Sequence, residues 1–65
     1  MAKFLSSTDL AIALAAKAGT LSLVERASRF GGTFVAIEDA YGVIEVQNNQ
    51  ADALARVAAI QEVAA

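Results

Sequence analysis

The chain has 65 residues, a formal net charge of −2 and a pI of about 4.7, and it contains neither Cys nor His. At this length we expect one domain over residues 1–65. Without Cys there can be no disulfide or thiolate metal site, and without His there can be no Ser-His-Asp triad. We therefore predict a protein that is not an enzyme, has no cofactor or metal, and has no apparent small-molecule substrate.

The apolar composition predicts association. Hydrophobic residues make up 57% of the chain, above the ~45–50% typical of soluble domains, and many of them are alanines with little side-chain area. A domain of this size buries only about 60% of the surface that its unfolded chain exposes. We expect partner subunits, either copies of this chain or another protein, to complete the burial.

The charge and the apolar runs also bear on location. The acidic balance argues against nucleic acid as a partner, and no apolar run reaches the ~20 residues of a membrane span. The first residues, MAKFLSS, do not have the pattern of a secretion signal. We expect a cytoplasmic protein, or a component of an intracellular or virion assembly.

The first predicted element is a helix over about residues 7–18. Ser6 and Asp9 have the spacing of a capping box, and Gly19 suits a left-handed C-terminal cap. After Asp9 only Lys17 is charged, so the helix is apolar on all sides, which is typical of a helix buried on more than one side. We predict that this helix contacts a partner through Leu10, Ile12, Leu14 and Ala16.

A second helix is predicted over about residues 21–30. Thr20 is a candidate N-cap, and Gly31–Gly32 would end the helix. Because Gly19 costs only about 1 kcal/mol inside a helix, one long kinked helix is an alternative to two separate helices.

Two helices followed by a hairpin also suggest a helix-turn-helix with a β wing. In that arrangement Arg26 and Arg29 on the second helix would contact DNA. Glu25 lies beside them and would repel phosphate, and a solvated helix face with a Glu25–Arg29 ion pair is the simpler interpretation. A small DNA-binding regulator remains an alternative function.

A β-hairpin is predicted over about residues 33–47. The segments TFVAIE and VIEVQ are rich in β-branched residues and flank DAYG, in which Asp39 and Gly42 suit a turn. Closing the hairpin there pairs Ile37 with Ile44. The buried face then holds Val35, Ile37, Ile44 and Val46, and the other face holds Phe34, Ala36, Glu38, Val43, Glu45 and Gln47.

Glu38, Asp39 and Glu45 raise the question of a cation site. Hard cations favour oxygen ligands, but no acidic loop with ligand spacing is present. We interpret the three carboxylates as the solvent side of the hairpin, where charges prevent edge-to-edge pairing, and leave weak cation binding as an alternative. Phe34 and Tyr41 are predicted as further anchors for a partner protein.

The last predicted element is a helix over about residues 49–63. Asn48 or Asn49 would cap it, and Asp52 and Arg56 would form an i,i+4 pair. The predicted fold is a small α+β domain in the order α-α-β-β-α with one β-hairpin. Because a lone two-stranded sheet is marginal in water, we expect hairpins from two or more subunits to join or stack, so that self-association completes the core.

Two resemblances bear on function. The segment LVERASRFGGTFVAIEDAYGVIEVQN is similar to the helix–strand–strand segment of HPr-like phosphocarrier proteins, over less than half of the chain. That family's phosphorylated His is absent, so phosphotransfer does not carry over. The helix–hairpin–helix order at this length also resembles, in topology and pattern, the small head-completion protein of lambda-like phages.

The function predicted from the residues is non-enzymatic. We expect a self-associating structural or assembly subunit, or a small adaptor within a larger complex. The second resemblance implies an alternative, a phage head-tail or virion assembly component.

Overall fold

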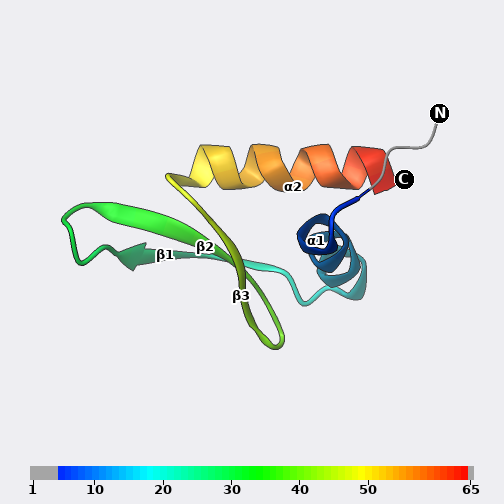
Figure 1. Ribbon diagram of the computed structural model, residues 1–65, viewed down its shortest axis with the longest axis horizontal. Coiled ribbons are helices and arrows are strands. Elements are labelled where there is room, and N and C mark those ends of the chain that lie inside the picture. Colours follow the sequence, from blue (N-terminus) through cyan, green and yellow to red (C-terminus); the bar gives the residue numbers. More distant parts are fainter. Residues whose placement is uncertain (1–4, 65) are drawn as a thin grey trace.

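The computed structural model describes residues 5–64, and for residue 64 the backbone alone. Its elements are, in chain order, α1 (Ser7–Ala18), β1 (Ser22–Ala27), β2 (Thr33–Asp39), β3 (Gly42–Gln47) and α2 (Gln50–Ala64). The strands form one antiparallel sheet in the order β1-β2-β3. Both helices pack on the same face of this sheet (Figure 1). The chain is therefore a small two-layer α+β unit.

Local signals in the sequence account for both ends of α1. The Asp9 N–H donates to Ser6 Oγ at 3.1 Å, and the Ser6 N–H donates to the Asp9 carboxylate at 3.4 Å, which completes a capping box. Gly19 ends the helix with φ at 76°, a left-handed conformation that glycine adopts without strain. Helix α1 lies where the sequence indicates.

The predicted helix over residues 21–30 is wrong, and strand β1 and a turn lie there instead. Pairing of β1 with β2 places Leu23 opposite Ile37, and Leu23 packs against the core that Ile37 helps to form. This pairing outweighs the local helix signals, because side-chain packing against a neighbouring strand decides strand stability more than intrinsic propensity does. Gly31 and Gly32 have positive φ and form the β1–β2 turn. The order is thus α-β-β-β-α, and the single kinked helix is excluded as well.

The β2–β3 register differs from the predicted one because Ile44 is an extra residue in β3. Ile37 pairs with Glu45, and the ladder shifts at this point. A β-bulge sets two residues of one strand opposite one residue of its partner. Ile44 packs against the core and Glu45 bonds Arg56 of α2, so both lie on the helix side. The predicted Ile37–Ile44 pair and the placement of Val46 on the buried face are therefore wrong.

Helix α2 begins after Asn49, one of the two caps predicted. The Asp52 N–H donates to Asn49 Oδ1 at 2.8 Å, and Asn49 Nδ2 donates to the Asp52 carboxylate at 3.3 Å. The predicted Asp52–Arg56 pair is wrong, because Arg56 bonds carboxylates of α1 and β3 instead.

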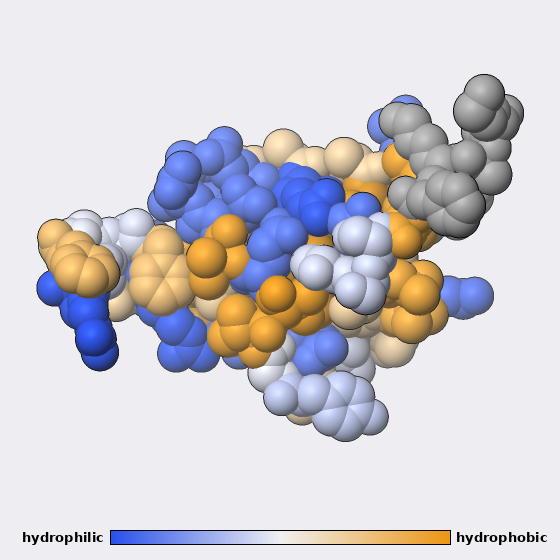
Figure 2. Space-filling view, viewed as in Figure 1, coloured by the Kyte–Doolittle hydropathy of each residue, from blue (hydrophilic) through white to orange (hydrophobic). Residues whose placement is uncertain are grey.

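The two faces of the sheet differ in what covers them. Directly opposed residues of antiparallel strands share a face, and the register therefore assigns each paired residue to one of the two faces. The helix-covered face supplies Leu23, Val35, Ile37 and Ile44 to a core completed by Ile12, Ala53, Val57 and Ile60. The open face consists of Ser22, Val24, Arg26, Phe34, Ala36, Glu38, Val43 and Val46. Among residues 5–64 no element covers this face, and hydrophobic surface is visible along β3 (Figure 2).

The core makes a direct prediction for stability. Ile12 is fully buried, and Ile→Ala at such a site removes transfer free energy and leaves a cavity, so the free energy of unfolding should fall by about 2–5 kcal/mol. A domain of this length has only about 3–10 kcal/mol in all, and the variant should be marginally folded. Leu54→Ala at a half-exposed position of α2 should cost about 1 kcal/mol or less. Urea denaturation followed by circular dichroism measures both, and similar losses for the two variants would contradict the packing described.

Candidate interaction surface

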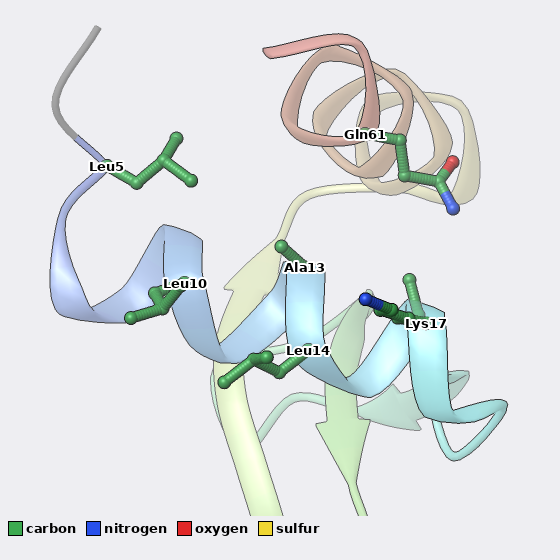
Figure 3. Close-up of a pocket in the computed structure, with 7 residues that line it drawn as sticks. Leu5, Leu10, Ala13, Leu14, Lys17 and Gln61 are labelled. Atoms are coloured by element: carbon green, nitrogen blue, oxygen red, sulfur yellow. The ribbon is translucent and has the colours of Figure 1, made fainter. Parts of the chain in front are cut away.

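The outward side of α1 is apolar and uncovered. Leu10 and Leu14 are 48% and 58% exposed, whereas Ile12 and Ala15 on the opposite side of the helix are buried in the core. Leu5, just ahead of the helix, lies near Leu10 (Figure 3). We call Leu5, Leu10, Leu14 and Lys17 the α1 surface. Lys17, in the last turn, is its only charge.

A hollow lies on each side of Leu14. The larger, of about 420 Å³, lies between α1 and the C-terminal half of α2, where Gln61 faces Ala13 and Lys17 (Figure 3). The second, of about 290 Å³, lies between α1 and the β2–β3 turn and is bordered by Tyr41. Small-molecule sites combine an apolar cleft with several convergent polar groups, and among the residues that the structure describes only Lys17 and Gln61 bring polar side chains to the larger hollow. Its shape and chemistry suit an apolar side chain of a partner better than a polar ligand.

The structure distributes the predicted contact residues over different places. Leu10, Leu14 and Ala16 line the larger hollow, and Tyr41, 98% exposed, borders the second one. Ile12 lies within the chain's own core and does not reach the α1 surface. Phe34 is on the open face of the sheet, apart from these residues. Reasoning from sequence missed Gln61 as a lining residue, because no local pattern indicates that α2 packs beside α1.

Arg56 of α2 connects this helix to both α1 and the sheet. Its Nε donates to Glu45 Oε2 at 2.9 Å and its Nη2 donates to Glu45 Oε1 at 3.1 Å, a two-point contact with β3. The same Nη2 donates to Asp9 Oδ1 of α1. Gln47 Nε2 donates to Glu45 at 2.7 Å and orients that carboxylate. Asp9, which forms the capping box of α1 with Ser6, is thus tied to α2 and, through Arg56, to the sheet.

This contact changes the acidity of its members. Hydrogen bonds from Arg56 lower the pKa of Asp9 and of Glu45, and they outweigh the opposite effect of burial. The two carboxylates in turn raise the pKa of Arg56. All three groups are therefore held in their charged forms at neutral pH.

The three carboxylates of the hairpin do not form one site. Glu38 pairs with Arg26 at 2.6 Å on the open face of the sheet. Asp39 accepts hydrogen bonds from two backbone N–H groups of the β2–β3 turn. Glu45 faces the helices and pairs with Arg56, so its predicted place on the solvent side is wrong. In the part of the chain that the structure describes, no three acidic side chains converge as cation ligands.

The arginines predicted as DNA contacts do not lie on a helix. Arg26 is in β1 and pairs with Glu38, and Arg29 is in the β1–β2 turn. A helix-turn-helix reads the groove with its second helix, and residues 19–49 contain strands and turns but no helix. The arrangement that suggested DNA binding is therefore absent from the described residues.

Comparisons with models of protein families, with curated proteins and with solved structures find no match to this chain. Neither α1 nor α2 is long and apolar enough to cross a membrane. The residues and geometry described above are the basis for the function proposed below.

The Arg56 contact predicts a pH dependence of stability. Asp9 and Glu45 have ordinary pKa values of 3.8 and 4.5, and both are lowered in the folded chain. Around and below pH 4 the unfolded chain therefore binds more protons than the folded chain. Stability from this contact is complete above the ordinary pKa values and is lost as the pH falls through the lowered ones.

Arg56→Gln should reduce the free energy of unfolding at pH 7 and make its decline between about pH 5 and pH 2 shallower, because both carboxyls return towards their ordinary pKa. Urea unfolding at several pH values measures this. Arg29→Gln is the matched control, since Arg29 is exposed and forms no ion pair within residues 5–64. A slope for Arg56→Gln equal to that of the parent would show that the contact does not set the acid sensitivity.

Proposed function

We propose that this chain is a non-enzymatic, self-associating structural or assembly subunit, and that it associates through the α1 surface. The observation that carries the proposal is the pair Leu10 and Leu14, both about half exposed on one side of α1 with a hollow beside them. Burying a leucine fully stabilises by about 1.5–3 kcal/mol relative to leaving it exposed. A partner that covers both leucines therefore gains a substantial part of the free energy of a stable contact.

The shape and charge of the α1 surface favour a second copy as the partner. Leu14 projects between two hollows, so the surface offers both a knob and the holes that receive one, as two-fold contacts require. An antiparallel pair of α1 helices also keeps the two Lys17 side chains at opposite ends of the contact, where a parallel pair brings them together. Like charges opposite one another destabilise a contact, and the antiparallel arrangement avoids this.

Non-enzymatic function is supported by the state of the reactive side chains. The carboxylates of the hairpin are engaged by arginines or by the backbone of a turn. Among the described residues, Lys17 and Gln61 are the polar groups that line the larger hollow, and a pair of this kind has no base positioned against a nucleophile.

Leu14→Glu tests the proposal against a closely matched control. The change places a carboxylate in the contact, and because burying an unpaired charge costs several kcal/mol, the dissociation constant should rise at least about 100-fold. Leu54→Glu makes the same change at a leucine of α2 that is 55% exposed and lies outside the α1 surface, and it should leave association unchanged. Molar mass is measured by light scattering on a sizing column over a wide concentration range, with circular dichroism to verify folding.

Two results would count against the proposal. A parent chain that stays at 6.7 kDa at the highest concentrations does not self-associate, which favours an adaptor that binds a different protein. An equal loss of mass in both glutamate variants would show that the contact is not at α1.

A further inference from the structure

The open face of the sheet is a second uncovered apolar surface, separate from α1. Val43 and Val46 of β3 are 56% and 54% exposed, and Phe34 of β2 and Val24 of β1 on the same face are partly exposed. Hydrophobic surface follows β3 in Figure 2. The core of the chain lies on the opposite face, so these side chains contribute to no packing within residues 5–64 beyond their own strand neighbours.

The charges of this face form one diagonal pair. Arg26 lies opposite Phe34, and Glu38 lies opposite Ser22, so their 2.6 Å ion pair crosses the Val24–Ala36 pair between them. Ala36 is fully buried although it lies on the open face, consistent with the flanking side chains and this ion pair covering it. The face as a whole is neutral, with Arg26 of β1 and Glu38 of β2 on opposite sides of the Val24–Ala36 pair along the strands.

We propose that a second copy of this chain stacks on the open face, sheet against sheet, as a self-association surface that does not depend on the α1 surface. Face-to-face sheets pack about 10 Å apart with their strands nearly aligned. Consider a two-fold axis that runs perpendicular to the strands and passes over Ala36. It places Phe34 of one copy over Glu38 of the other copy. Arg26 of one copy then lies beside Glu38 of the other, so the ion pairs of the two copies are complementary while the valines pack between them.

Two separate self-complementary surfaces on one chain determine what it assembles into. A single two-fold contact stops at a dimer, whereas two of them build either a closed tetramer or an open chain of subunits. The inference therefore predicts assemblies larger than a dimer.

Four chains separate the two surfaces: the parent, Leu14→Glu, Val46→Glu and the double variant. The parent should contain more than two copies, each single variant should be a dimer, and the double variant should be a folded monomer by light scattering and circular dichroism. If Val46→Glu weakens folding, Val43→Thr with Val46→Thr takes its place, because threonine keeps the branched shape of valine in a strand while adding a hydroxyl.

The failures of the two proposals are distinguishable. If Val46→Glu keeps the mass of the parent and Leu14→Glu is a monomer, the stacking is wrong and the α1 contact stands. If Leu14→Glu keeps the parent's mass and Val46→Glu is a monomer, the α1 contact is wrong and the stacking stands. A monomeric parent overturns both.

A charge exchange tests the stacked arrangement itself, in the Leu14→Glu background where only the sheet face remains. Arg26→Glu gives two negative groups on the face and Glu38→Arg gives two positive groups, so each variant alone should dimerise at least about 10-fold more weakly. Mixing the two in equal amounts should restore dimers, because opposite charges then face each other. A mixture that remains monomeric would overturn the proposed stacking.

Discussion

Ile44 is one residue more than the β2–β3 ladder needs, and the side chains of β3 depend on this bulge for their direction. Without it, strict alternation would put Ile44 and Val46 on one face and Glu45 on the other. With it, Ile44 enters the core, Glu45 reaches Arg56 of α2, and Val46 turns to the open face. One inserted residue thus places Ile44 against the core, Glu45 beside the helices and Val46 on the open face.

The Arg56 contact is a consequence of that bulge. Because Glu45 faces the helices, Arg56 can bond β3 and, through Asp9, the first turn of α1 at the same time. Asp9 also caps α1, so one carboxylate serves a local and a long-range role. Removing a single member of such a network leaves the others partly desolvated and unpaired, and the three elements are therefore coupled in stability.

How much of the fold could be predicted depends on how far apart in the sequence the interacting residues lie. Both ends of α1 could be predicted, because Ser6, Asp9 and Gly19 act on backbone groups only a few residues away in the sequence. The segment SLVERA lies between the helix signals of Thr20 and Gly31–Gly32, yet it is a strand because it pairs with β2, whose paired residues lie 6 to 16 residues further along the chain. A bulge has no reliable local signature, and the partners of Arg56 lie 11 and 47 residues from it in sequence. Only the tertiary structure decides between them and Asp52.

The sequence predicted that α1 carries an apolar contact surface, but it did not determine which residues of the helix form that surface. An all-round apolar α1 indicated more hydrophobic surface than the chain alone covers, and Leu10 and Leu14 are exposed. Ile12 was indistinguishable from them in the sequence, because which side of the helix meets the sheet is set by packing and not by composition.

The excess of apolar surface has a structural cause in the size of the sheet. Two helices suffice to cover one face of three short strands, and residues 5–64 contain no further element for the second face. Helix α1 buries Ile12 and Ala15 on its inner side, and with these two residues buried the geometry of the helix turns Leu10 and Leu14 outward. The open face and the α1 surface are therefore uncovered for the same reason, because residues 5–64 contain too few elements to cover them. A second copy of the chain, as proposed above, would cover both surfaces and remove them from water.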